Sequence, residues 1–154
     1  MAVTLFSGVT GVGLSTICQA VRARVGDEFL LINFGDVMLE QAATHNITSD
    51  RQELSALSQR QTQRLQRRAG EYVADKATSN HIILSTHLAV ETEAGYIHGL
   101  PDSVSEREIE FAQQLNRTAA FEYARDRNAH IQFIENENSV NEAVEKTVDI
   151  LTDE

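Results

Sequence analysis

Nine residues near the beginning of the chain have the composition and spacing needed to hold a phosphate group. Glycines stand at positions 8, 11 and 13, and a serine and a threonine follow at 15 and 16. Glycines at this spacing allow several backbone N–H groups to turn toward one anion, and a helix that begins directly after them adds the positive end of its dipole. The sequence therefore predicts a phosphate-binding loop, in which the residues expected to contact the ligand are Gly8, Gly11, Gly13, Ser15 and Thr16.

One position of this loop departs from the pattern G-x-x-x-x-G-K-[ST]. Leu14 stands where the pattern has lysine. The lysine neutralises charge on the β- and γ-phosphates while a phosphoryl group is transferred, and an aliphatic side chain cannot replace it. The backbone donors are retained, whereas a cationic group needed for the chemistry is missing. The alternative interpretation is a glycine turn that joins a strand to a helix and binds no ligand.

The segments around the loop alternate between strands and helices. Short apolar runs predict strands at residues 2–6, 29–33, 81–85 and 130–134. Apolar residues at helical spacing predict helices at residues 16–24, after 35, at 50–78, after 105 and after 139. Residues 86–101 are expected to form a loop.

This alternation is typical of an α/β fold with a parallel sheet and right-handed crossovers. We expect residues 1–154 to form a single domain, a three-layer sandwich in which a four-stranded, mainly parallel sheet is flanked by helices. In such sheets ligands bind beyond the carboxyl ends of the strands. The loops that begin at Gly8, Phe34 and Thr86 all lie at those ends.

Polar residues mark the expected starts of three helices. Asp50 is predicted to be the N-cap of one long helix, whose apolar stripe runs from Leu54 to Ala77. The pattern Ser-x-x-Glu, which is typical of a capping box, occurs at residues 105–108 and again at 139–142.

The charge balance argues against nucleic acid as a partner and indicates a protein adapted to concentrated salt. The chain has 13 Lys and Arg against 23 Asp and Glu, a formal net charge of −10. Only Lys76 and Lys146 are lysines, and there is no tryptophan. Such a surface stays soluble in concentrated salt, where screening removes the self-repulsion, so we interpret the protein as halophilic. The negative charge argues against nucleic acid as a partner, and the arginines at 64, 67 and 68 are interpreted as a solvated helix face.

No apolar run is long enough to cross a membrane, and the N-terminus leads directly into a strand without a signal sequence. We therefore expect a cytoplasmic protein with no membrane partner. The only cysteine, Cys18, cannot form an internal disulfide and is expected to be a buried thiol. The five histidines lack the spacing of a metal site, and no nucleophile-elbow pattern is present.

Six stretches of the chain, in order, resemble the archaeal type of adenylate kinase, a small P-loop nucleoside monophosphate kinase. They are Gly-Val-Thr-Gly-Val-Gly-Leu-Ser-Thr at 8–16, Asn-Phe-Gly-Asp-Val-Met-Leu at 33–39, Asp-Arg-Gln-Glu-Leu at 50–54, Thr-His at 86–87, Gly-Tyr-Ile-His-Gly-Leu-Pro at 95–101 and Gln-Leu-Asn-Arg-Thr-Ala-Ala at 114–120. The resemblance covers most of the chain.

This resemblance implies ATP or ADP as ligand, Mg²⁺ as cofactor and Ser15 as the magnesium ligand. It also places Asp36, Arg51 and His87 in stretches that border the nucleotide sites of the family. Each of the three has a structural alternative: Asp36 as an N-cap, Arg51 as an ion-pair partner of Glu53 or of a neighbouring helix, and His87 as a structural histidine.

The chain departs from the family pattern at four places that matter for chemistry. Leu14 replaces the loop lysine, Ser85 replaces an acidic residue that helps hold Mg²⁺, and Glu91 replaces an arginine expected to hold the phosphate of AMP. After Pro101 the family continues with a strand and an arginine-bearing lid, whereas this chain runs directly into a predicted helix. A unit of roughly 30 residues is therefore missing, and the lid with it.

Three functions remain open. The favoured one is an adenylate kinase-like protein with lost or strongly reduced phosphotransfer, which acts as a weak nucleotide-binding or regulatory protein. The second is an active kinase that converts ATP and AMP into two ADP through a divergent site. The third is a protein-interaction module that binds no nucleotide. Without the missing unit, either the strand at 130–133 lies against the first strand or an edge of the sheet is left open. Because an open edge can pair with another chain, we also expect a protein partner or a homo-oligomer.

Overall fold

The computed structural model describes residues 3–8, 11–86, 90–92, 95–97, 117, 120–121, 124–125, 130–134, 136 and 139–152. The chain forms two compact units that interleave along the sequence. The first unit comprises residues 1–4 and 27–84, and the second comprises residues 5–26 and 85–154. That the whole chain forms one domain stays a prediction.

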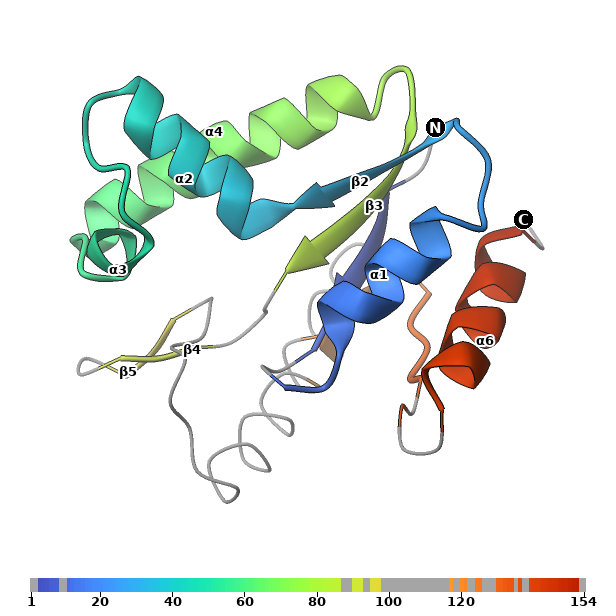
Figure 1. Ribbon diagram of the computed structural model, residues 1–154. Coiled ribbons are helices and arrows are strands. Elements are labelled where there is room, and N and C mark those ends of the chain that lie inside the picture. Colours follow the sequence, from blue (N-terminus) through green and yellow to red (C-terminus); the bar gives the residue numbers. More distant parts are fainter. Residues whose placement is uncertain are drawn as a thin grey trace. The chain divides into compact units, whose positions relative to one another are not determined.

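The described residues form one parallel sheet of three strands. Its strands are β1 (Val3–Ser7), β2 (Phe29–Asn33) and β3 (His81–Thr86), and β3 lies between the other two (Figure 1). The sheet is flanked by helices, so the predicted α/β fold is confirmed. Three of the four predicted strands are present at the expected positions, and β3, the central one, is the most buried.

The predicted fourth strand, at residues 130–134, is wrong. These residues are described and belong to no strand, so the sheet has three strands within the described part of the chain. Phe133 explains the difference, because half of its surface is exposed and its ring lies 5.3 Å from that of Phe121. Arg117 stacks on the same ring at 5.7 Å. Phe133, which contributed to the prediction of a buried strand, therefore lies in an aromatic contact at the surface.

Three helices of the first unit follow β2. They are α2 (Phe34–Thr44), α3 (Arg51–Ser55) and α4 (Gln59–Lys76). Helices α2 and α4 pack side by side (Figure 1). The buried core beneath them combines the predicted stripe of α4 with residues from β2, α2 and β3: Ile32, Val37, Ala69, Val73 and Ile82.

The long helix predicted from Asp50 is two helices. Asp50 is an N-cap as expected, and its carboxylate accepts a hydrogen bond from Gln52 N at 2.7 Å, but the helix that it starts ends at Ser55. Ser58 then begins α4 with a reciprocal capping box, in which its hydroxyl accepts from the backbone N–H of Gln61. A second cap eight residues after the first restarts the helix and leaves a break at residues 56–58.

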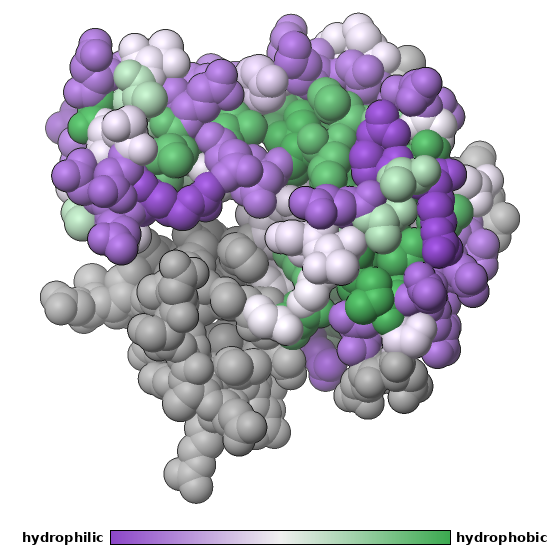
Figure 2. Space-filling view, in the orientation of Figure 1, coloured by the Kyte–Doolittle hydropathy of each residue, from purple (hydrophilic) through white to green (hydrophobic). Residues whose placement is uncertain are grey.

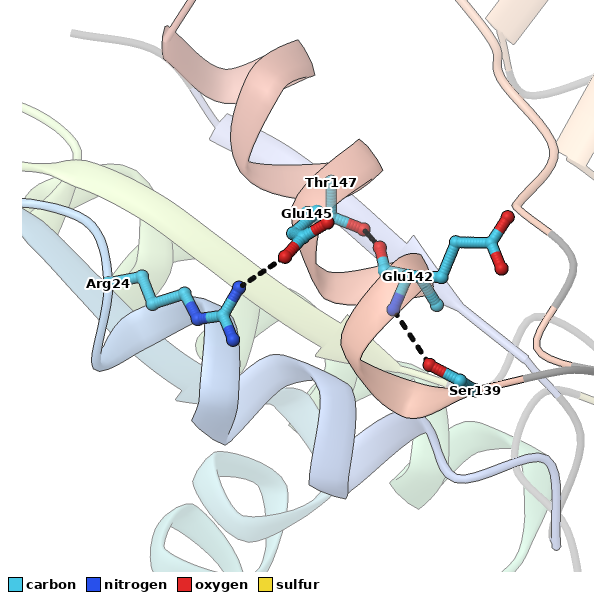
Figure 3. A network of polar contacts seen from close by, with 6 residues as sticks. Arg24, Ser139, Glu142, Glu145 and Thr147 are labelled. Atoms are coloured by element: carbon cyan, nitrogen blue, oxygen red, sulfur yellow. Dashed lines mark hydrogen bonds and ion pairs between the residues drawn. The ribbon is translucent and has the colours of Figure 1, made fainter.

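Two helices pack against each other in the second unit. They are α1 (Leu14–Arg22) and α6 (Val140–Thr152), which lie side by side in Figure 1. Polar contacts at their border are drawn in Figure 3, where Arg24 Nη1 lies 3.9 Å from Glu145 Oε1. The predicted cap of α6 is confirmed, since Ser139 Oγ accepts a hydrogen bond from Glu142 N at 3.1 Å (Figure 3). The residues buried on these two helices are Cys18, Val21, Ala143, Val144 and Thr147.

The loop predicted at residues 86–101 is partly a hairpin. Strands β4 (Val90–Thr92) and β5 (Gly95–Ile97) pair antiparallel, with Glu91 opposite Tyr96. The helix predicted after residue 105 lies mostly outside the described residues, but positions 117, 120–121 and 124–125 are helical as expected.

The described surface is mainly hydrophilic. Figure 2 shows hydrophilic residues over most of the visible described part, with smaller hydrophobic areas between them. None of the helices in the described ranges has the length and apolar content needed to cross a bilayer.

Candidate functional site

The predicted phosphate loop has the backbone conformation that its glycines were expected to allow. Gly11 and Gly13 have φ angles of 90° and 80°, a region that side chains disfavour. Gly8 is restricted by space instead, since a Cβ built on it would lie 2.8 Å from Val12 Cγ2. All three glycines are therefore required by the shape of this loop, whose residues Val9 and Thr10 lie outside the described part.

Helix α1 begins directly after the loop and leaves its first N–H groups without a side-chain cap. Gly13 is the N-cap residue and has no side chain to accept a hydrogen bond. The first turn of α1 has no acidic residue, and Ser15 and Thr16 are exposed there. A helix start with these features presents backbone donors, two hydroxyl groups and a positive dipole end to an anion.

The cationic group of a catalytic phosphate loop is absent from this helix start. Leu14, the first residue of α1, is half-buried and carries no charge. Cys18 lies one turn further along, and its burial raises the pKa of its thiol to about 11, so it stays neutral at physiological pH. No residue from position 11 to position 21 is basic.

Ser85 lies near the carboxyl end of β3 and is buried, with 6% of its surface exposed. A neutral hydroxyl can be buried there at low cost, whereas an unpaired carboxylate at the same degree of burial would be strongly disfavoured. Ser85 therefore places a neutral, buried hydroxyl where the resemblance implies an acidic residue.

A second group of polar residues surrounds the start of α2 in the first unit. Asn33 is the N-cap, and its Oδ1 accepts a hydrogen bond from Asp36 N at 3.1 Å, so the interpretation of Asp36 as the N-cap is wrong. Asp36 instead pairs with Arg51 from α3. This confirms the alternative in which Arg51 binds a neighbouring helix rather than Glu53, and Glu53 accepts from Thr48 Oγ1 at 2.6 Å.

Gly35 lies close to both Arg51 and Asn33. A Cβ built on Gly35 would lie 3.4 Å from Arg51 Nη1 and 3.3 Å from Asn33 Oδ1. Asp36 and Arg51 are both exposed, so the pair is open to solvent and to any ligand at the start of α2.

The side chains of two predicted site residues lie outside the described part of the chain. His87 lies outside the described residues, and of Glu91 only its backbone in β4 is described. The structure groups Gly8, Gly11, Gly13, Ser15 and Thr16 around one loop of the second unit, and it pairs Asp36 with Arg51 in the first unit. In the described ranges no three His, Cys, Asp or Glu side chains gather in a way that could hold a metal ion.

Sequence analysis missed one residue that contacts the loop. Asn136 Nδ2 donates a hydrogen bond to the carbonyl oxygen of Val12 at 3.0 Å. The two residues are 124 positions apart, and no local pattern marks the contact. The only signal available was an asparagine placed between an apolar run and a helix cap, which is also common in loops that contact nothing.

Comparison with known proteins identifies relatives over nearly the whole chain. A family model described as an AAA domain matches residues 7–127. The adenylate kinase of Pyrococcus horikoshii is 32% identical over 185 aligned positions, which cover 97% of this chain and 94% of the relative. The adenylate kinase of Pyrococcus furiosus is 31% identical with the same coverage, and that of Methanococcus aeolicus is 30% identical over 183 positions, covering 94% of this chain and 95% of the relative.

The lengths of these alignments bear on the missing unit. The chain has 154 residues and the first alignment has 185 positions, so at least 31 aligned positions have no residue of this chain. That deficit matches the size of the strand-plus-lid unit that the sequence was predicted to lack.

Proposed function

We propose that this chain, which belongs to the adenylate kinase family, binds an adenine nucleotide through residues 8–16. We further propose that it transfers phosphoryl groups poorly or not at all. The start of α1 carries this proposal. There, left-handed glycines and uncapped N–H groups form an anion-binding turn, and Leu14 occupies the place of the cation. Binding depends on the backbone N–H groups and catalysis on the cation at position 14, so binding can persist when catalysis is lost.

The binding half of the proposal rests on donors that do not depend on side-chain charge. Backbone N–H groups at a helix start bind phosphate through hydrogen bonds and the helix dipole. Gly11 and Gly13 shape the turn, and the exposed hydroxyls of Ser15 and Thr16 add two further polar groups. Without a lysine the affinity should be weak, because the phosphate charge is only partly compensated.

Magnesium would enter this site with ATP or ADP. Mg²⁺ prefers oxygen ligands and is usually held by one or two carboxylates together with phosphates. Here the exposed Ser15 hydroxyl would be its protein ligand and the nucleotide phosphates would supply the rest, because Ser85 offers no carboxylate. The residues present therefore fit a magnesium ion that is bound together with the nucleotide. Mg²⁺ supplies charge neutralisation between the phosphates when it is bound.

The catalytic half of the proposal rests on several losses in one site. Phosphoryl transfer depends mainly on positioning and charge stabilisation, and a single catalytic arginine is worth ~10³–10⁵ in rate. Leu14 and Ser85 remove one cationic and one acidic group, and the deficit of aligned positions supports the absence of the lid. A lid excludes water and completes the site, so its loss adds to the other two.

Asp36, Arg51 and His87 are proposed to border the second nucleotide position. Arg51 is the only one of the three whose charge suits a phosphate, and it is held by Asp36 at the start of α2. A monophosphate at this place would compete with the Asp36 carboxylate for the guanidinium. Glu91, which replaces an arginine of the family, would repel the same phosphate.

Two measurements in molar KCl test the proposal. Calorimetric titration with ADP should show binding in the micromolar to millimolar range. A coupled assay with Mg-ATP and AMP should show turnover at least ~10³-fold below that of the Pyrococcus horikoshii relative at a temperature where both are folded. Turnover within tenfold of the relative would establish an active kinase instead. Absence of heat up to millimolar ADP would leave a module that works through protein partners, in line with the predicted self-association.

Restoring the cation sharpens this test. Leu14→Lys should tighten ADP binding about tenfold, the equivalent of one charge-assisted hydrogen bond. Gln19→Lys is the matched control, because Gln19 is exposed on the same helix and a lysine there is screened from the loop in molar salt. An equal gain in both variants would show that general attraction, and not a contact in the loop, causes the effect.

A further inference from the structure

We propose that Asn136 is a positioning residue of the phosphate loop, which fixes the Val12–Gly13 peptide so that the N–H of Gly13 faces the bound phosphate. This inference rests on the proposed function, because it assumes that residues 8–16 hold a phosphate. It concerns a residue from the far end of the chain that belongs to neither the glycine pattern nor the stretches that resemble the family.

The contact itself has one chemically sensible orientation. Asn136 Nδ2 lies 3.0 Å from the carbonyl oxygen of Val12, and the contact is partly buried. A carbonyl oxygen only accepts, so the amide must present its nitrogen to it. Both residues belong to the second unit, so the contact is internal to one compact part of the chain.

This hydrogen bond determines which way the following N–H points. In a trans peptide the C=O and the N–H lie in one plane and point in opposite directions. Holding the Val12 carbonyl toward Asn136 therefore turns the Gly13 N–H away from Asn136. The next carbonyl, that of Gly13, is held by Ile17 N at 3.0 Å as the first hydrogen bond of α1.

Two consecutive carbonyls are thus fixed, and the N–H between them is left for another acceptor. Within the described residues no acceptor for the Gly13 N–H is found. A buried or half-buried N–H without a partner is costly, so a group in this position is normally satisfied by a ligand or by water. A phosphate oxygen at the start of α1 is the acceptor that the geometry suits.

Asn136 also packs closely on Gly13. A Cβ on Gly13 would lie 3.0 Å from Asn136 Nδ2, closer than ordinary contacts allow. The left-handed φ of 80° is what requires glycine at this position. The amide of Asn136 therefore packs directly on the residue whose N–H it orients, and the loop cannot shift its Val12–Gly13 peptide without losing this contact.

The test uses the full chain in molar KCl, with ADP and inorganic tripolyphosphate as probes. Asn136→Ala should weaken the binding of both probes by about five- to thirty-fold, the range expected when one hydrogen bond that orients a donor is lost. Asn141→Ala is the matched control, because Asn141 is exposed on α6. The affinity of this variant for both probes should stay within twofold of that of the wild type.

A second variant separates the hydrogen bond from packing. Asn136→Asp keeps the size and shape of the side chain, but its carboxylate cannot donate and repels the Val12 carbonyl. It should lose at least as much affinity as Asn136→Ala. Wild-type affinity in Asn136→Asp would overturn the proposal, because space filling alone would then explain the residue.

The amide resonance of Gly13 supplies a readout that a general loss of stability does not change. In the wild type, tripolyphosphate should shift the Gly13 ¹H resonance downfield, as a new hydrogen bond does, and in Asn136→Ala this shift should be absent or much smaller. If wild-type protein binds and Asn136→Ala binds equally well, this inference is overturned while the proposed function stands. If wild-type protein binds neither probe, the proposed function fails and takes the inference with it.

Discussion

Helices α1 and α2 both follow a strand of the sheet, but their N-termini are capped differently. Each follows a strand of the sheet, α1 after β1 and a glycine loop, and α2 directly after β2. At α2 the side chain of Asn33 accepts the N–H of Asp36. At α1 the cap is a left-handed glycine without a side-chain hydrogen bond. The fold caps the start of α2 with a side chain and leaves the start of α1 without a side-chain cap.

The first turns of the two helices differ in charge as well. Helix α2 carries Asp36 in its first turn, where a carboxylate compensates the positive dipole end, and Arg51 pairs with that carboxylate. Helix α1 has no acidic residue in its first turn. An anion at α2 would meet a negative charge, whereas one at α1 would not. This difference, more than the presence of glycine, distinguishes the candidate phosphate loop at α1 from the capped start of α2.

The largest effect should come from closing the open start of α1. Gly13→Val puts a β-branched side chain at a φ of 80° and against Asn136, so we expect ADP affinity to fall at least about hundredfold and the free energy of unfolding to fall by about 2–3 kcal/mol. Titration calorimetry and urea denaturation in KCl measure the two quantities.

Gly70→Val is the matched control for this substitution. Gly70 is exposed within α4, and a Cβ built on it meets nothing within 4 Å. Valine is a better helix former than glycine, so a gain of a few tenths of a kcal/mol is expected there, with unchanged ADP binding. Similar losses at both glycines would mean that the α1 start has no special role.

A smaller effect, on the pH dependence of stability, should come from the buried faces of α1 and α2. Burial raises the pKa of Cys18 on α1 from 9.0 to about 11, whereas α2 buries Val37 and Ala42, which do not titrate. Because the folded protein disfavours the thiolate, the stability from this group is full below pH 9 and is lost as the pH rises toward 11. At pH 10 the loss should be about 1 kcal/mol.

Cys18→Ala removes this contribution. The difference in the slope of unfolding free energy against pH between wild type and Cys18→Ala, measured from pH 8 to 10, isolates the thiol from other groups that titrate there. Hydrogen exchange should accelerate in α1 before α2 in the wild type only. Parallel slopes in the two proteins would contradict the assigned burial.

The smallest effect should come from opening the closed start of α2. Asn33→Ala removes the acceptor for Asp36 N and should lower the free energy of unfolding by about 1 kcal/mol. Asn33→Gly should cost only a few tenths, because glycine is itself a tolerated cap. Thermal unfolding in KCl distinguishes the two. Equal stability of Asn33→Ala and wild type would show that the hydrogen bond contributes nothing.

Features that depend on a few neighbouring residues were predicted correctly. Four such features follow from patterns within one turn or one strand: the unusual backbone conformation at Gly11 and Gly13, the strand at 29–33, the buried thiol of Cys18 and the cap formed by Ser139. The cap at Asp50 was predicted as well, but the break before Ser58 was not, because the apolar stripe continues through Leu57 and hides a second capping box.

Errors arose where neighbours in space compete with neighbours in sequence. Asp36 has the composition of a cap, but Asn33 stands three residues earlier and takes that role, which leaves Asp36 to bind Arg51. The run at 130–134 is apolar enough for a strand, yet Phe133 contacts Phe121 at the surface. Neither outcome could be predicted from a local pattern, because the contacts with Arg51 and Phe121 depend on which residues the fold places next to each other.

The sequence by itself determined the family, the α/β alternation, the loop of glycines and the absence of a charged group at Leu14, because these properties belong to residue types at short spacing. Only the tertiary structure decided that α1 starts open while α2 is capped by Asn33, and that Asn136 holds the Val12 carbonyl from 124 positions away. The physical reason is that a hydrogen bond needs its two atoms within about 3 Å. Packing, and not spacing along the chain, brings such atoms together.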